Sequence, residues 1–287
     1  MLKSSLLLAA LSGSLLPVQP EIVSGNGATS PVATNSAATL VVQPEPVAVE
    51  PRAQRSSRSA IEPIALRTTD KVALKADFYA PREGERRAPA VLLLHGAGAD
   101  RSTVADLAEG LQRAKFAVLA IDLRGHGEST EGDLDWSEMD EEARKTLWAF
   151  ATRDVDAAAR WLSQREGIHS TNLTVIGVGA GGALAIRHAA DDENVRCVGV
   201  IGLATETYGF DLSSDLRDVE GLPVLIAAAR DERDAAVELV AEVEGDDYVT
   251  VGGLRASSDE ILTDKKLRKL VVDWVEAEAM PKRGGRG

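Results

Sequence analysis

From residue 61 onward, the chain alternates between short apolar runs and amphipathic segments. Two short alternating runs, 64–68 and 72–79, flank Thr69 and Asp70 and predict an antiparallel hairpin. Longer, continuous apolar runs are typical of strands that are buried on both faces of a parallel sheet. Such runs cover residues 90–95, 116–122, 173–177, 197–203 and 222–228, and a shorter one at 247–251 predicts a last strand.

Amphipathic segments separate these runs, with apolar residues at the spacing of one helix face. They predict helices over residues 103–114, 154–164, 182–190, 234–243 and 265–278. The stretch 123–143 is rich in carboxylates and predicts a solvated loop, because its spacing does not match a calcium loop. Strands that alternate with helices predict an α/β fold with a mostly parallel, doubly wound sheet of about eight strands. The short connection between the runs 197–203 and 222–228 leaves no room for a large lid domain.

The first 60 residues differ from the rest, because they hold six of the eleven prolines and no aromatic residue. Lys3 followed by the apolar stretch 6–16 resembles a secretory signal and is too short to span a membrane. We therefore expect a signal peptide at 1–20, a disordered linker rich in Pro, Ser and Ala at 21–60, and one folded domain at 61–287. This predicts export to the periplasm or the medium. The alternative is a cytoplasmic protein with an unstructured extension.

Charge and cysteine content exclude several functions. The chain carries 45 Asp and Glu against 32 Lys and Arg, for a net charge of −13, and such a surface repels nucleic acid and anionic lipid. We expect no nucleic-acid partner and no membrane span. Cys197, the only cysteine, lies in an apolar run, which predicts a buried structural thiol and excludes an intramolecular disulfide and a cysteine-rich metal site. We expect neither a metal nor a cofactor.

Four motifs occur in a fixed order along the predicted domain. An apolar strand ends in His95-Gly96, and the next strand leads into D-x-R-G-H-G-x-S, which supplies Asp122, Arg124, Gly125, His126, Gly127 and Ser129. A third strand leads into Gly177-Val-Gly179-Ala-Gly181, and a fourth ends near Asp231. This series resembles the α/β-hydrolase superfamily, and most closely its serine-aminopeptidase, monoglyceride-lipase and dienelactone-hydrolase-like members. The resemblance implies an α/β-hydrolase fold over about residues 64–279.

The resemblance also implies a catalytic triad, which this sequence does not supply. The family's nucleophile elbow reads G-x-S-x-G, and Gly179 stands at the serine. Asp231 stands at the acid, and by register either Arg255 or Ser257 stands at the histidine. The four histidines are at 95, 126, 169 and 188, so none lies in the region where the base belongs. An arginine cannot replace it, because a guanidinium does not give up its proton near neutrality.

Other family positions keep a role that needs no side chain. The resemblance places the oxyanion-hole N–H groups at Ala97 and Ala180, and these backbone donors could still bind a carbonyl or an anion. His95 and His126 are expected to be structural rather than an alternative base. For Asp231 three interpretations remain open, namely a leftover triad acid, an ion pair with Arg255 and a solvated loop carboxylate.

Three functions follow from these observations. The first is a non-catalytic module that binds a small acyl or carboxylate ligand or a protein partner. The second is a weak or unconventional hydrolase of small esters or amides. The third is a dinucleotide-binding protein, because Gly177, Gly179 and Gly182 also fit the G-x-G-x-x-G pattern, with Glu206 as the late acidic residue.

Overall fold

The computed structural model of the chain describes residues 61–81, 87–132, 134–203, 208–245 and 247–280. The expected signal peptide at 1–20, the expected linker at 21–60 and Glu206 lie outside these residues. Export therefore stays a prediction. No helix in the described ranges is both long enough and apolar enough to cross a membrane.

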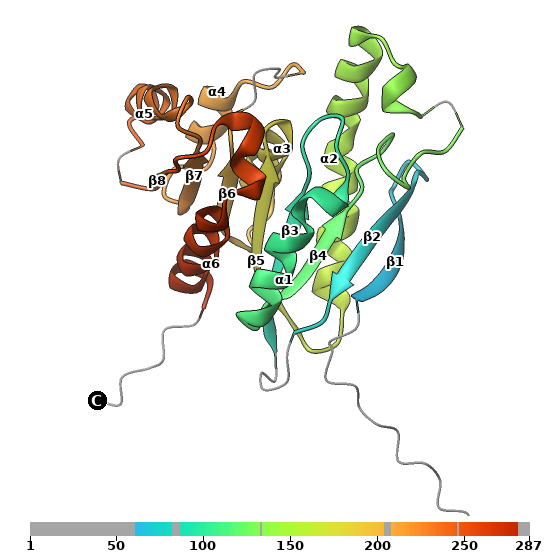
Figure 1. The fold of residues 1–287 in the computed structure, drawn as a ribbon. Coiled ribbons are helices and arrows are strands. Elements are labelled where there is room, and N and C mark those ends of the chain that lie inside the picture. Colours follow the sequence, from blue (N-terminus) through green and yellow to red (C-terminus); the bar gives the residue numbers. More distant parts are fainter. Residues whose placement is uncertain (1–60, 82–86, 133, 204–207, 246, 281–287) are drawn as a thin grey trace, which may run out of the picture. The chain divides into compact units, whose positions relative to one another are not determined.

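Eight strands form a single mixed sheet within the described residues (Figure 1). Their order in the sheet is β1-β2-β4-β3-β5-β6-β7-β8. The hairpin strands β1 and β2 are antiparallel, β2 also pairs antiparallel with β4, and all other pairs are parallel. The strands are β1 (Ile61–Arg67), β2 (Ala73–Tyr79), β3 (Ala88–Leu94), β4 (Ala117–Ile121), β5 (Ile168–Val178), β6 (Val195–Ile201), β7 (Val224–Ala228) and β8 (Val249–Gly253). The predicted mostly parallel sheet of about eight strands is confirmed.

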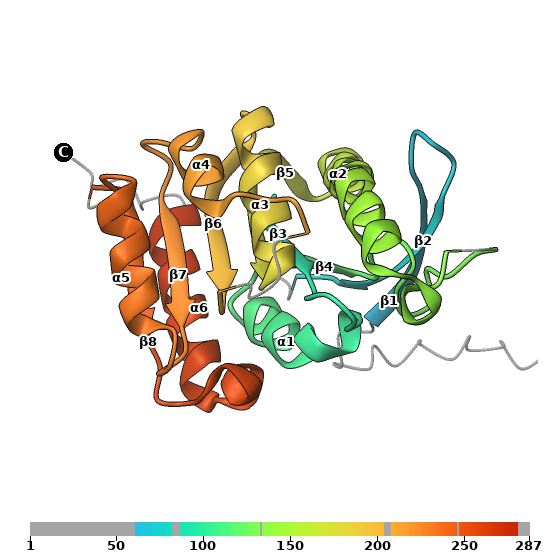
Figure 2. The ribbon, with the colours of Figure 1, turned by 90° about the horizontal axis from the view of Figure 1, so that it is seen from above.

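Helices cover both faces of this sheet (Figure 2). The α-helices are α1 (Ala105–Arg113), α2 (Glu141–Gln164), α3 (Ala180–Asp191), α4 (Leu212–Arg217), α5 (Arg233–Glu242) and α6 (Lys265–Ala279). Helices α1 and α6 share one hydrophobic cluster with the sheet, and α2 to α5 share the other. Alternate residues of β3 explain this division, because Val91 and Leu93 enter the first cluster while Leu92 and Leu94 enter the second.

Helix α2 is longer than the sequence pattern predicts, so the expected loop at 123–143 and helix at 154–164 need correction. The helix begins at Glu141, because the side chain of Asp140 accepts a hydrogen bond from the N–H of Ala143 and caps its first turn. Leu147, Trp148 and Ala151 extend the buried stripe upstream of the predicted start. The sequence reading also missed α4, whose six residues are too few to show a helical period.

The connection between β6 and β7 holds α4 as its one described helix. It contains no large lid domain in the residues that the structure places, as predicted. The carboxyl ends of β3, β4, β5 and β7 lead into the loops that carry the family motifs, so the parallel sheet brings these loops to one edge.

Candidate functional site

The turn at Gly179 joins β5 directly to α3. Gly179 has φ 51° and ψ −117°, which is backbone space that a residue with a Cβ seldom adopts. Its N–H donates to the carbonyl of Ile201 on β6 at 3.0 Å, and its own carbonyl accepts from Gly182 at 2.9 Å. The chain therefore makes a sharp strand-to-helix turn, which is the geometry of a nucleophile elbow.

The glycines of this turn have different neighbours. A Cβ on Gly177 would overlap the carbonyl of Gly181, and a Cβ on Gly181 would overlap the carbonyl of His95. A Cβ on Gly182 would lie 2.7 Å from the side chain of Val200. Close packing, against backbone at Gly177 and Gly181 and against the Val200 side chain at Gly182, thus accounts for these three glycines without a bound phosphate. Gly179 differs, because a Cβ there would have no atom within 4 Å and would face open space.

The loop after β3 lies against this turn. A Cβ on Gly96 would be 3.4 Å from the carbonyl oxygen of Val178, the residue before Gly179. Ala97 follows in this loop, and Ala180 is the first residue of α3, whose N–H has no acceptor within the helix. The fold therefore places Ala97 and Ala180 on two adjoining segments, as the family's oxyanion hole requires.

His95 lies beneath this loop and is fully buried. Its Nε2 accepts a hydrogen bond from the N–H of Leu123 at 3.0 Å, so its proton is on Nδ1, which donates to the carbonyl of Gly96 at 2.7 Å. Burial lowers the pKa of His95 to about 4. The ring is thus neutral at pH 7, and both nitrogens are used to hold loops in place.

His126 has a similar environment and is 3% exposed. Its Nδ1 donates to the carbonyl of Arg124 at 2.9 Å, and its ring stacks on Trp136 with 4.7 Å between centroids. Burial, with a smaller contribution from the neighbouring His95, lowers its pKa to about 4. These contacts support the predicted structural role, because a ring that is neutral and stacked is held in one position.

Asp122 organises the turn that follows β4. Its carboxylate is fully buried and accepts from the N–H of Arg101 at 2.7 Å and from the N–H of Glu128 at 2.8 Å, and it also pairs with the guanidinium of Arg101. Gly127 has to be glycine, since a Cβ there would overlap this carboxylate. Ser129 closes the turn, because its hydroxyl donates to the carbonyl of Asp122 at 2.7 Å.

Arg124 links the same turn to helix α2 and to the hairpin. Its guanidinium donates to Asp154 from Nε at 2.9 Å and to Asp70 from Nη1 at 2.9 Å, and only 4% of the residue is exposed. Burial raises the pKa of Asp154 to about 6, although its hydrogen bonds with Arg124 oppose this rise. The Arg124 guanidinium holds the pKa of Asp70 well below its usual range. All three groups are therefore charged at neutral pH.

Asp231 and Arg255, the positions expected for a triad acid and base, lie on exposed loops after β7 and β8. The carboxylate of Asp231 accepts from the N–H of Ser258 at 2.9 Å and from its hydroxyl at 2.8 Å. These bonds lower the pKa of Asp231, so it is a carboxylate at neutral pH. Arg255 is exposed and forms no ion pair among the described residues, so the pairing with Asp231 that was left open is not formed. The side chain that bonds to Asp231 is Ser258, rather than Arg255 or Ser257.

Sequence reasoning missed an aromatic cluster next to the loop after β3. A Cβ on Gly98 would lie 3.2 Å from Nε1 of Trp136, and Tyr208 contacts Trp136 and Trp148 at ring distances of 5.3 and 5.7 Å. Trp148 is fully buried, and Phe210 packs edge-on against it at 6.4 Å. The spacing of Leu147, Ala151 and Val155 could have revealed this part of α2, because it continues one helix face.

Other expectations concern metal ions and the thiol. Within the described ranges, no group of three or more His, Cys, Asp and Glu side chains is arranged to hold a metal ion. Cys197 is fully buried beside the hydroxyl of Thr174, at 3.2 Å, and burial raises the pKa of the thiol to about 12. Its predicted burial is confirmed, and such a thiol is not a nucleophile at neutral pH.

The fold and the turn define the class of this protein. A mixed sheet with an antiparallel hairpin at one edge, and a sharp turn from β5 into α3 beside the His95-Gly96 loop, form the scaffold of an α/β hydrolase. The model of the Alpha/beta hydrolase family matches residues 91–279, and the chain belongs to this family.

Similar proteins include several hydrolases. A probable 2-oxo-3-(5-oxofuran-2-ylidene)propanoate lactonase of Bradyrhizobium sp. is 32% identical over 41% of this chain and 47% of its own length. The chain spans less than half the length of the curated relatives it matches, between 37% and 47%. Among solved structures, a dienelactone hydrolase from Anabaena variabilis has a TM-score of 0.56 at 21% identity, over 77% of this chain and 99% of that one. An esterase of Pyrococcus furiosus has a TM-score of 0.60 at 17% identity, over 77% and 94%. Similarity at these identities shows the fold alone.

Proposed function

We propose that this chain does not hydrolyse substrates through a serine triad and that it binds a small acyl or carboxylate ligand at the Gly179 turn. The observation that carries the proposal is Gly179 itself. The turn has the geometry of a nucleophile elbow, yet the position that should present an attacking oxygen has no side chain and faces open space. An ester bound there would meet no nucleophile from this residue.

The acid and base positions support the same proposal. A triad base needs an imidazole that the acid orients. Asp231 instead bonds to Ser258, and no histidine follows His188 in the sequence. His95 does not take over this role, since both of its ring nitrogens already form hydrogen bonds with the backbone.

Ligand binding at the Gly179 turn needs only the backbone N–H donors and an apolar surface beside them. The N–H groups of Ala97 and Ala180 lie on adjoining segments, and the N-terminus of α3 adds a partial positive charge that favours a carbonyl or a carboxylate. Trp136 contacts the same loop beside Gly98, so it would supply an apolar surface for the body of the ligand. The dinucleotide alternative has less support, because packing within the chain explains Gly177 and Gly182.

Ester turnover tests this proposal. Purified chain is mixed with p-nitrophenyl acetate, and the release of nitrophenolate is compared with buffer. We expect equal rates, because loss of the nucleophile of a triad costs roughly a million-fold in turnover. Saturable turnover that disappears in Ala97→Pro, which removes one backbone donor, would instead establish an unconventional hydrolase. Binding of acetate or butyrate is then measured by calorimetry, and we expect it to weaken in Ala97→Pro.

A further inference from the structure

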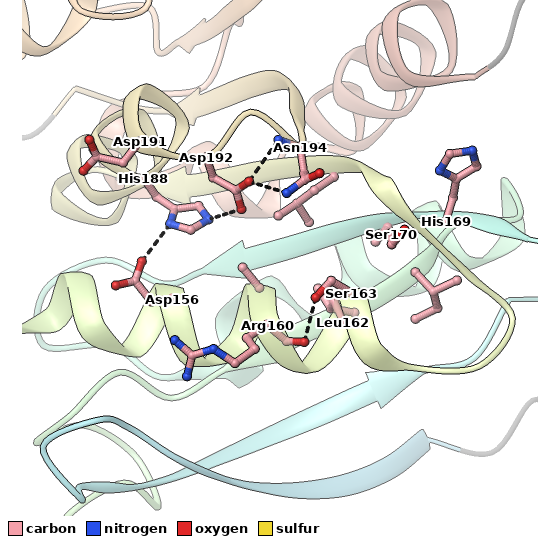
Figure 3. Close-up of a pocket in the computed structure, with 14 residues that line it drawn as sticks. Asp156, Arg160, Leu162, Ser163, His169, Ser170, His188, Asp191, Asp192 and Asn194 are labelled. Carbon is pink, nitrogen blue, oxygen red and sulfur yellow. Dashed lines mark hydrogen bonds and ion pairs between the residues drawn. The ribbon is translucent and has the colours of Figure 1, made fainter.

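A cavity lies far from the Gly179 turn, between α2, α3 and the start of β5 (Figure 3). Its volume is about 310 Å³, which is within the range of small-molecule sites. Helix α3 begins at Ala180, beside the turn, and its residue His188 lines the cavity. At 1.5 Å per residue, about 12 Å of helix separates these two residues, so the cavity is at the other end of α3.

The cavity has an apolar floor and an acidic rim. The floor consists of aliphatic side chains from β3, α2 and β5, namely Ala90, Ala159, Leu162, Ile168 and Leu173. The rim carries Asp156 from α2, Asp191 from the end of α3, and Asp192 just after it. Arg160 is exposed at the rim and forms no ion pair with these carboxylates in the described part of the chain. The lining thus combines apolar surface with an excess of negative charge.

His188 stands between two of these carboxylates, as Figure 3 shows. Its Nδ1 is 3.1 Å from Oδ1 of Asp156, and its Nε2 is 3.4 Å from Oδ2 of Asp192. The residue is 7% exposed, and its Nε2 has no hydrogen-bond partner among the described residues. A neutral imidazole has one N–H, so if Nδ1 donates to Asp156, the lone pair of Nε2 faces a carboxylate oxygen. A donor placed beside these two acceptors, within reach of both, would satisfy them.

A neighbouring hollow makes the region still more acidic. Its volume is about 620 Å³, and it shares Asp156, His188 and Asp191 with the first cavity. Asp215 and Asp218 also line it. One carboxylate oxygen of Asp215 bonds to Arg187 at 2.9 Å, while the other is buried without a hydrogen-bond partner in the described residues. Two buried acceptors without a hydrogen-bond partner in the described residues, Nε2 of His188 and Oδ2 of Asp215, therefore line these hollows and point to a ligand that brings hydrogen-bond donors and positive charge.

We propose that this cavity is a binding site for an organic cation, namely a primary alkyl ammonium ion. The ammonium group would donate to Oδ2 of Asp192 and to Nε2 of His188, and the alkyl chain would lie on the apolar floor. An ammonium ion fits, because it has three donors and no acceptor. An anion would be repelled by the three rim carboxylates, and a neutral alcohol would bring one donor and no charge to offset them.

Binding of hexylamine, with hexan-1-ol as its neutral counterpart, tests the proposal on the unaltered chain. Isothermal calorimetry at neutral pH should show saturable binding of hexylamine and at least about tenfold weaker binding of hexan-1-ol, because only the amine pairs with the carboxylates. Absence of saturable hexylamine binding, or equal affinity for the alcohol, would overturn the proposal without any variant.

Variants then locate the site. Asp156→Asn together with Asp192→Asn keeps the shape of the rim and removes two charges, and we expect hexylamine to bind at least about tenfold more weakly. The matched control is Asp273→Asn, an exposed carboxylate on α6, which should leave the affinity unchanged. In addition, the NMR signals of the His188 ring should shift on titration with hexylamine and stay unchanged with hexan-1-ol. Equal weakening by the control, or a silent His188 ring, would place the amine elsewhere.

Discussion

Two regions at the carboxyl edge of the sheet differ sharply in how their polar side chains are held. In the turn 122–129, Asp122 and Arg124 are buried and each makes several hydrogen bonds to charged groups or to the backbone. At the triad-equivalent positions, Gly179 has no side chain, and Asp231 and Arg255 are exposed. The first region is thus held by buried hydrogen bonds and ion pairs, and the second is open to solvent.

This difference separates the scaffold of the family from its chemistry. The D-x-R-G-H-G-x-S turn ties β4 to the hairpin through Asp70 and to α2 through Asp154, so the fold depends on it whether or not a reaction takes place. Gly179 has no side chain, Asp231 bonds to the nearby loop residue Ser258, and Arg255 forms no ion pair in the described residues, so we expect a change at these positions to leave the fold intact. A motif that identifies a family can therefore be structural, and it does not by itself predict activity.

The largest effect on stability is expected from Arg124. Arg124→Met should cost about 3–5 kcal/mol in the free energy of unfolding, because the change leaves the buried carboxylate of Asp154 without its partner. Arg153→Met is the matched control, since Arg153 pairs with Asp70 but its side chain is 42% exposed, and it should cost less than about 1 kcal/mol. Urea unfolding measures both. Similar costs for the two variants would refute the structural role of the turn.

Substitutions of the elbow glycines Gly181 and Gly179 should differ less in their cost to the free energy of unfolding than those of Arg124 and Arg153. Gly181→Ala should cost about 3 kcal/mol, because the new Cβ would overlap the carbonyl of His95. Gly179→Ala should cost only about 1 kcal/mol, from its positive φ, since nothing lies near the new Cβ. Thermal and urea unfolding can compare them. If Gly179→Ala lowered the free energy of unfolding more than Gly181→Ala does, the open space next to Gly179 would be contradicted.

A third contrast concerns pH and the buried histidines. His126 has its pKa lowered from 6.5 to about 4 in the folded chain, so the unfolded chain binds more protons between these values. Its contribution to stability is complete above pH 6.5 and is lost as the pH falls toward 4, at up to about 1.4 kcal/mol per pH unit. The raised pKa of Asp154 acts in the opposite direction below pH 6.

His126→Phe isolates this contribution, because it keeps a ring against Trp136 and removes the titrating group. The variant should be less stable at neutral pH, where the bond to the Arg124 carbonyl is lost, but its stability should fall less steeply between about pH 6.5 and 4. Urea unfolding at several pH values measures the slope. An unchanged slope would mean that the pKa of His126 does not differ between the folded and unfolded chain as described.

Most of the fold could be predicted from sequence, because buried parallel strands give continuous apolar runs such as 90–95 and 173–177. The motif residues could also be found from the sequence, because each motif lies within a few consecutive residues. The start of α2 was missed because its exposed first turns are dominated by carboxylates, and the Asp140 cap is a single residue. Contacts between distant segments, such as Asp231 with Ser258 or Trp136 beside Gly98, depend on loop conformations that no periodicity encodes.

Covalent labelling tests the central claim most directly. The chain is incubated with a fluorophosphonate probe at neutral pH, beside an active serine esterase as the positive control, and intact mass is recorded by mass spectrometry. We predict that the mass of this chain stays unchanged. Position 179 has no hydroxyl, and no histidine follows His188 to activate the hydroxyl of another residue. A stoichiometric phosphonyl adduct on any residue at the Gly179 turn would contradict the account.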